Sequence, residues 1–301
     1  MMFTLSKGAL RFTSERVRLI GIADIAVRVT ILSKDRITMK ALLLSAIAMI
    51  SVTAWVLTHA SEAPRSSDVR IPILVELFTS EGCSSCPPAD GLLSRLDRQP
   101  VAGAELVVLS EHVDYWNRLG WKDPYSSHFF SDRQNVYADR FGSLSVYTPQ
   151  VVVDGANEFV GSNSGSASGA IVQALRAPKI PVYLSSVTLE HTNIVRAHVE
   201  TGSLPDSFGL AEVEVYAVIA LNHAESRVSN GENGGRTLAH TAVVKNFTKV
   251  GTLRKGQSFA QDVLLKVDAG ADANNLRLIA LLQEPRQGRV VGATVEFVGA
   301  K

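Results

Sequence analysis

The first part of the chain body alternates between short apolar runs and apolar residues at helical spacing. The run ILVELFT at Ile73–Thr79 and the run ELVVLS at Glu105–Ser110 predict two buried strands. Between them, apolar residues three and four apart predict a helix over Pro87–Arg98, with its two prolines in the first turn. This alternation predicts an α/β domain over residues 70–178. Its further predicted elements are a helix at Ser126–Phe141, a hairpin of Gln150–Asp154 and Glu158–Val160, and a helix at Ser166–Arg176.

The pattern changes after Pro181, where short β-like runs follow one another with turn residues between them. Apolar and polar residues alternate strictly in EVEVY, which begins at Glu212. Short strands at this spacing over residues 181–300 predict an all-β domain, an immunoglobulin-like sandwich. The predicted strands are Val182–Leu189, Ile194–Glu200, Glu212–Leu221, Ala239–Phe247, Phe259–Val267, Leu276–Leu282 and Val290–Phe297.

Residues 1–60 form a basic N-terminal extension that contains an apolar segment. The segment Ala41–Leu57 carries no charge, Lys40 precedes it, and Thr58-x-Ala60 follows it as a signal-peptidase site would. These flanks favour a cleaved export signal, which predicts a periplasmic or secreted body. The alternatives are an uncleaved anchor that leaves the body facing the periplasm, and an organellar transit peptide.

Composition excludes several classes of function. The 301 residues are 46% hydrophobic and 20% charged, as expected of a globular protein rather than a disordered chain. Thirty Lys and Arg against 29 Asp and Glu leave a net charge of +1, which argues against nucleic-acid binding by phosphate neutralisation. The sequence has no GxGxxG after a strand and no Walker pattern, so we expect no nicotinamide, flavin or nucleotide cofactor.

The only two cysteines stand in Cys83-Ser84-Ser85-Cys86, between a predicted strand and a predicted helix. A cysteine at a helix N-terminus meets unpaired N–H groups and the positive end of the helix dipole, and both lower the pKa of its thiol. We therefore expect Cys83 to open the helix and act as the nucleophile. Cys86, one turn further along and more buried, would be the resolving thiol.

Other interpretations of the cysteine pair stay open. A static structural disulfide is one of them. Metal binding is another, although one CxxC supplies only two of the four ligands of a closed zinc site, so no metal site is predicted from it alone. His112 or His128 would have to complete a copper site of soft ligands.

His112 and Asp114 follow the second predicted strand, at the carboxyl edge of the sheet where α/β proteins collect ligands. We predict that they line the thiol site as substrate-binding residues or orient one another. The alternative is a hydrogen-bonded pair of loop residues without a role in the chemistry.

Longer strings resemble a known family. They are ELFTSEGCSSCPPAD from Glu76, HVDYW from His112, GWKDP from Gly120, and Gly231-Glu232-Asn233. Together they look like an exported bacterial thioredoxin-like family known as domain of unknown function 1223, over about residues 70–300. The resemblance implies the α/β fold class, with a thioredoxin-like domain that is followed by the all-β domain.

The resemblance also implies roles for three further residues. In the thioredoxin fold, the strand before the cysteines carries a buried acid that moves protons for the resolving thiol, and Glu76 takes that place here. An ordinary salt-bridged glutamate is the alternative. The segment YTPQVVVDG from Tyr147 resembles the loop that holds the fold's cis-proline. This implies a cis Pro149 beside the cysteines and a Thr148 backbone that pairs with the substrate chain.

The function expected from these residues is extracytoplasmic thiol–disulfide exchange. Cys83 would attack a protein or small-molecule disulfide, Cys86 would resolve the mixed disulfide, and a dithiol redox partner would supply electrons. The rival hypotheses are a binding or assembly module with a structural disulfide, and a copper-handling chaperone. Contact with a membrane is expected only through an uncleaved N-terminal segment.

Overall fold

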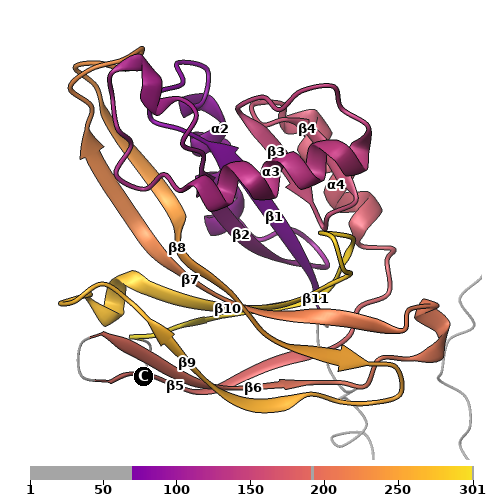
Figure 1. The fold of residues 1–301 in the computed structure, drawn as a ribbon. Coiled ribbons are helices and arrows are strands. Elements are labelled where there is room, and N and C mark those ends of the chain that lie inside the picture. The colour runs from indigo at the N-terminus through magenta and orange to yellow at the C-terminus, as the bar shows by residue number, and fades with distance from the viewer. Residues whose placement is uncertain (1–69, 191–192, 300–301) are drawn as a thin grey trace, which may run out of the picture. The chain divides into compact units, whose positions relative to one another are not determined.

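The computed structural model describes residues 70–190 and 193–299. The predicted export signal, with its apolar segment Ala41–Leu57, lies outside these ranges. The described residues form an eight-stranded mixed sheet, a three-stranded sheet and the helices α2, α3 and α4 (Figure 1). None of the described helices is long and apolar enough to span a membrane.

The larger sheet runs, in spatial order, through β11 (Val290–Phe297), β10 (Leu276–Gln283), β7 (Glu212–Arg227), β8 (Thr237–Arg254), β2 (Ala104–His112), β1 (Ile71–Thr79), β3 (Gln150–Val153) and β4 (Asn157–Val160). β1 and β2 are parallel, and β2 meets β8 in parallel through the pairing of Ser110 with Val243. The remaining neighbours in this sheet are antiparallel. The smaller, antiparallel sheet holds β5 (Val182–Glu190), β6 (Ile194–Thr201) and β9 (Ala260–Lys266).

The helices lie close to their predicted positions, and local chemistry explains their ends. α2 spans Pro87–Arg98, with prolines in its first turn and basic residues in its last turn, where they complement the helix dipole. α3 spans His128–Phe141 and ends at Gly142, whose positive φ of 67° suits a glycine. α4 spans Ser164–Ala174 and is capped by the Asn163 side chain, which accepts a hydrogen bond from the Ser166 N–H.

The predicted fold class, a thioredoxin-like α/β domain followed by an immunoglobulin-like sandwich, is wrong. The described chain is mostly β, with 46% strand and 20% helix. Strands from both predicted segments also join in one large sheet, because β8 pairs with β2. The local patterns predicted most strands well, but β7 and β8 extend by several residues beyond their apolar runs and reach across to the first half of the chain.

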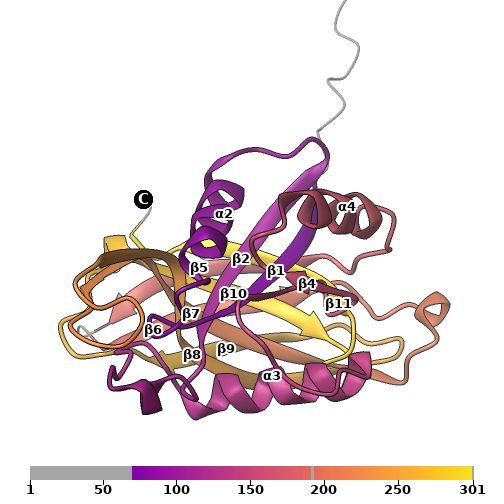
Figure 2. The same cartoon turned by 90° about the horizontal axis from the view of Figure 1, so that it is seen from above.

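The core lies on both faces of the larger sheet. β10 is buried along its whole length because one of its faces packs on the three-stranded sheet and the other packs with β1, β2 and α3. In β1, residues alternate between two faces. Leu77 packs with Ala89 of α2, whereas Leu74 and Phe78 pack with Tyr137 of α3. Viewed from above, α2 and α4 lie apart from α3 (Figure 2). The cysteines therefore lie at the start of a helix that covers one face of β1.

Candidate functional site

Cys83 and Cys86 form a disulfide in the turn between β1 and α2. Both cysteines are fully buried, while Ser84 and Ser85 between them are exposed. The Ser85 hydroxyl lies 3.3 Å from the Cys83 sulfur. This hydroxyl can donate a hydrogen bond to a Cys83 thiolate in the reduced protein.

The start of α2 differs from the prediction in one respect. Cys86, not Cys83, is the N-cap residue, and its carbonyl accepts the N–H groups of Ala89 and Asp90. Cys83 lies one turn earlier, and its carbonyl accepts the Cys86 N–H at 3.2 Å. The first two helical positions are Pro87 and Pro88, which carry no N–H. The helix start therefore offers a thiolate fewer amide donors than its position alone predicts.

The tip of the hairpin between β7 and β8 reaches the cysteine turn. The buried Asn233 donates from Nδ2 to the carbonyls of Glu81 and Cys83, at 2.9 Å each. Glu232 accepts the Ser84 N–H at 2.9 Å, and hydrogen bonding with the side chain and backbone of Ser84 lowers the pKa of the Glu232 carboxyl. Two neighbouring residues of the hairpin therefore bind the backbone around and between the cysteines.

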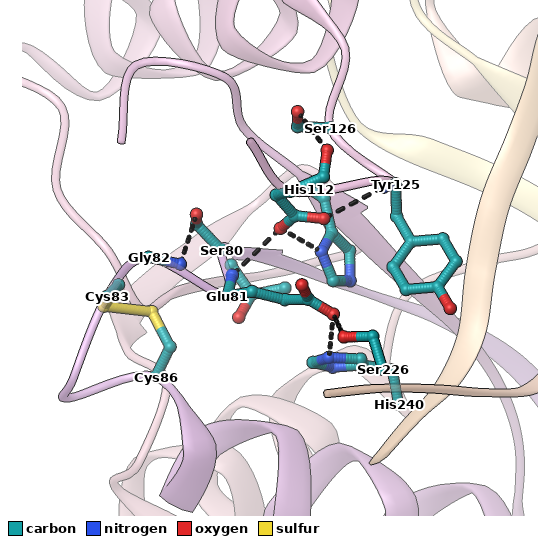
Figure 3. Close-up of polar contacts among 12 residues, drawn as sticks. Ser80, Glu81, Gly82, Cys83, Cys86, His112, Tyr125, Ser126, Ser226 and His240 are labelled. Carbon is teal, nitrogen blue, oxygen red and sulfur yellow. Dashed lines mark hydrogen bonds and ion pairs between the residues drawn. A yellow bond between two sulfur atoms is a disulfide. The ribbon is translucent and has the colours of Figure 1, made fainter. Parts of the chain in front are cut away.

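Glu81, two residues before Cys83, is the centre of a buried polar network (Figure 3). Its Oε2 accepts the indole N–H of Trp121 at 2.7 Å, and its Oε1 accepts the Ser226 hydroxyl. The Nε2 of His240 on β8 lies 3.3 Å from the same Oε1. The backbone N–H of Glu81 donates to Oδ2 of Asp123 at 2.9 Å. Side chains from both strands of the hairpin thus hold the segment that leads into the cysteine turn.

His240 is buried between two carboxylates. Besides Glu81, its Nδ1 lies 3.5 Å from Oδ1 of Asp90, a residue in the first turn of α2. Burial by itself lowers the pKa of His240, but the Asp90 and Glu81 carboxylates outweigh it and raise this pKa to about 10. His240 is therefore an imidazolium at neutral pH that ties β8 to both ends of the cysteine turn.

A second buried histidine lies against the first. The ring of His112 meets that of His240 edge to face, with 4.6 Å between centroids. Its Nδ1 lies 2.7 Å from Oδ2 of Asp123, which also accepts the Tyr125 N–H on its other oxygen. Burial opposes ionisation of Asp123, but His112 and the backbone donors prevail and lower the pKa of this carboxyl. The structure thus places His112 in the network beside the cysteine turn.

Asp114 does not contact the network that contains His112. Its Oδ1 accepts the Ser131 hydroxyl at 2.5 Å, and its Oδ2 lies 3.2 Å from Nδ1 of His128. Both partners belong to α3. Asp114 therefore fixes the first turns of that helix, and the acid that orients His112 is Asp123.

Glu76 lies on the face of β1 opposite to α2. Its carboxylate accepts Nε–H of Arg133 at 2.9 Å and the Tyr137 hydroxyl at 2.6 Å, both from α3. Gln283 of β10 contacts both donors, and all four side chains are buried. The salt-bridged alternative for Glu76 describes these contacts. The role in proton transfer to Cys86 that the resemblance implied has no support from this geometry.

The peptide bond between Thr148 and Pro149 is cis, as predicted. The Thr148 hydroxyl accepts the Trp116 indole N–H at 2.8 Å. Trp116 in turn lies so close to Gly82 that a Cβ on this glycine would be 3.0 Å from the Trp116 Cβ. Trp116 therefore connects the cis-proline loop to the residue immediately before Cys83.

Sequence reasoning missed most of the network. Glu81, Asp123 and His240 were not singled out, and Asn233 entered only through the resemblance in Gly231-Glu232-Asn233. The one signal present was a histidine, His240, within the mostly apolar segment 239–244 of β8, since Glu81 and Asp123 lie outside the strands. Among residues 70–190 and 193–299, no group of three or more His, Cys, Asp or Glu side chains is placed to hold a metal ion.

The region of the chain that matches a known protein family includes this whole site. A family model described as a protein of unknown function, DUF1223, matches residues 74–283. The chain belongs to the DUF1223 family. The matched DUF1223 region contains both cysteines, the network around Glu81 and the hairpin that carries Asn233 and His240.

Two solved structures resemble this DUF1223 protein. The X-ray crystal structure of AGR_C_4864 from Agrobacterium tumefaciens has a TM-score of 0.61 and 24% identity, over 77% of this chain and 96% of that one. HBP35 of Porphyromonas gingivalis has a TM-score of 0.59 and 16% identity, over 76% of each chain. At these identities the similarity concerns the fold alone. A search of the curated proteins finds no match.

Proposed function

We propose that this DUF1223 protein is a thiol–disulfide oxidoreductase that works outside the cytoplasm through Cys83 and Cys86. The observation that carries the proposal is the disulfide between the only two cysteines of the chain, three residues apart at the start of a helix. Pairs with this spacing exchange readily because the second thiol can attack a mixed disulfide on the first.

The reaction starts from the reduced pair. The Cys83 thiolate attacks one sulfur of a substrate disulfide, so that a mixed disulfide forms and the other substrate sulfur leaves as a thiolate. Cys86 then loses its proton and attacks the Cys83 sulfur, which restores the internal disulfide and releases the second substrate thiolate. The substrate gains two electrons, and another dithiol protein returns them to the pair.

The surroundings of the pair support this assignment of roles. The Ser85 hydroxyl, 3.3 Å from the Cys83 sulfur, is placed to donate to a Cys83 thiolate. Hydrogen bonds to the charged form of a group favour that form. The exposed Ser84 and Ser85 supply the surface on which a partner reaches the turn. The polar flank of the turn, with His240 and two carboxylates, differs from the apolar setting of an inert buried cystine.

Location outside the cytoplasm is part of the proposal. It rests on Lys40, the apolar segment Ala41–Leu57 and the Thr58-x-Ala60 site in the sequence. We expect the mature protein to begin near Ser61 or Pro64, as read by N-terminal sequencing after fractionation. A mature chain that still contains Met39 would show that the segment is not a cleaved signal.

A structural disulfide is the second candidate, and one observation favours it. Both cysteines are fully buried, so a partner cannot reach either sulfur unless the turn opens. In this case the disulfide would hold the turn and the protein would act as a binding module. The two candidates differ in the reduction potential of the pair, because structural disulfides commonly lie below about −300 mV and those of exchange proteins above about −270 mV.

The deciding experiment is a redox titration with a trapping assay. The purified protein is equilibrated in glutathione buffers and its free thiols are counted after acid quenching. We expect half-reduction above about −270 mV, and a pair that stays oxidised below about −300 mV would identify a structural disulfide. Cys86→Ser should trap a mixed disulfide with oxidised glutathione, whereas Cys83→Ser should not. The opposite trapping pattern would reverse the two roles.

A further inference from the structure

The tip of the β7–β8 hairpin, residues 228–236, contacts the cysteine turn from a distant part of the chain. We propose that Asn233 and Glu232 in this tip are positioning residues that set the balance between the disulfide and dithiol forms of Cys83 and Cys86. This inference rests on the proposed function. It adds to the redox site two residues that touch the backbone of the turn rather than its sulfurs.

Asn233 forms hydrogen bonds through both ends of its side-chain amide. Its amide nitrogen donates to the carbonyls of Glu81 and Cys83, and its amide oxygen accepts from Nη1 of Arg236 at 2.7 Å. The side chain is fully buried. Loss of the amide would leave the Glu81 carbonyl without its donor and the Cys83 carbonyl with the Cys86 N–H alone, which is unfavourable in a buried turn.

The two carbonyls that Asn233 binds flank Gly82. With both carbonyls held by one amide group, the backbone from Glu81 to Cys83 keeps one conformation. The N–H of Cys83 donates to the Ser80 carbonyl at 3.2 Å and closes the same turn. The same contacts in the reduced form would keep the two thiols close together. Two thiols that are held close together have a high effective concentration relative to each other, and this favours the disulfide.

Glu232 acts on the turn through charge. Its carboxylate binds the N–H of Ser84, the residue that follows Cys83, and hydrogen bonding with the side chain and backbone of Ser84 lowers its pKa, so it is ionised at neutral pH. A negative charge beside the turn disfavours a second negative charge on a cysteine sulfur. We therefore expect the Glu232 charge to disfavour a thiolate on Cys83 and, like Asn233, to favour the disulfide.

The test compares Asn233→Ala and Glu232→Gln with two matched controls from the same hairpin. Asn230→Ala removes an exposed amide whose Nδ2 donates to Ser229, and Glu225→Gln removes an exposed charge on β7. The equilibrium constant for disulfide formation is measured against glutathione. We expect it to fall at least threefold in each test variant and less than twofold in each control. A tenfold fall corresponds to about 30 mV.

A second readout separates charge from packing. Glu232→Gln keeps an oxygen that can accept the Ser84 N–H, so its effect should appear as a lower apparent pKa of the attacking thiol in a pH series of alkylation rates. That shift should shrink with added salt, since Glu232 is exposed. Far-UV circular dichroism and urea denaturation show whether Asn233→Ala is folded. If it is not, the exposed Glu232 still decides the test.

The outcomes distinguish this inference from the proposed function. A wild-type pair that does not equilibrate with glutathione overturns both. A wild-type pair that titrates, together with test variants that shift no more than Asn230→Ala and Glu225→Gln, overturns the positioning role alone. Equal shifts in all four variants would mean that the hairpin acts only through general stability, which also contradicts the proposal.

Discussion

Replacing His240 by glutamine should remove a pH-dependent part of the stability of the fold. His240 faces Glu81 from the cysteine turn, Asp90 from α2, His112 from β2 and the ring of Tyr125. Of these neighbours, the two carboxylates raise the pKa of His240 from 6.5 to about 10, against the effect of burial. The substitution removes the positive charge and leaves a side chain of similar reach.

The sign of the effect follows from this raised pKa. Below pH 6.5, His240 is protonated in both the folded and the unfolded chain, and its ion pairs contribute fully to stability. As the pH rises toward 10, the unfolded chain releases this proton while the folded chain keeps it, so the contribution falls. The slope is about 1.4 kcal/mol per pH unit, which gives a loss of about 2.5 kcal/mol between pH 7 and pH 9.

Urea denaturation at pH 7 and pH 9, with the disulfide intact, measures this loss. The difference in unfolding free energy between the wild type and His240→Gln should be about 2.5 kcal/mol smaller at pH 9 than at pH 7. A cavity of about 560 Å³ lies between α2 and the hairpin, and His240 and Asp90 are among the residues that line it. His223→Gln, an exposed change on β7, is the control and should run parallel to the wild type. Equal differences at both pH values would refute a charged His240.

Two further predictions concern the scaffold, and both are measured by urea denaturation at neutral pH. Arg133→Met should destabilise the fold by about 3–5 kcal/mol, because it leaves Glu76 charged and buried without a cation. Adding Glu76→Gln to this variant should restore part of the lost stability. If the losses caused by the two substitutions simply add, the reasoning is contradicted. Gly155→Ala should destabilise strongly, since its φ is +62° and the new Cβ would lie 2.2 Å from the Gly288 carbonyl oxygen, whereas Gly169→Ala in α4 meets nothing within 4 Å and should be neutral or slightly stabilising.

Local patterns predicted the elements of this fold but not their partners. The apolar run at Leu276–Gln283 marks a strand that is buried on both faces, and this is visible in the sequence. The polar residues Glu225–Arg227 extend β7 beyond its apolar run because they pair with β8, and a backbone pairing of that kind leaves no hydrophobic pattern. The predicted fold class, with a separate fold for each half of the chain, was wrong for the same reason. The pairing of β2 with β8, which joins the two halves of the chain in one sheet, leaves no local signal in the sequence.

The site shows the same division between local and distant information. The cysteine pair follows from residues near one another in the sequence, and the cis bond before Pro149 was implied by the resemblance. The sequence does not say which face of β1 the helix α2 covers, and the structure places Glu76 on the other face, against α3. The contacts of Asn233 and His240 arise only when the hairpin crosses to the cysteine turn.

The order in which the chain is synthesised gives the long hairpin a particular consequence. Asn233 follows Cys83 by 150 residues, so both cysteines are synthesised well before the residues that bind their turn. An emerging chain therefore presents a CxxC pair without its hairpin to the oxidants and thiols around it. Once β7 and β8 have been made and β8 has paired with β2, the same pair is buried in its turn and held by the hairpin. The cysteine sulfurs of the nascent chain are thus more accessible to oxidants and thiols than those of the folded protein.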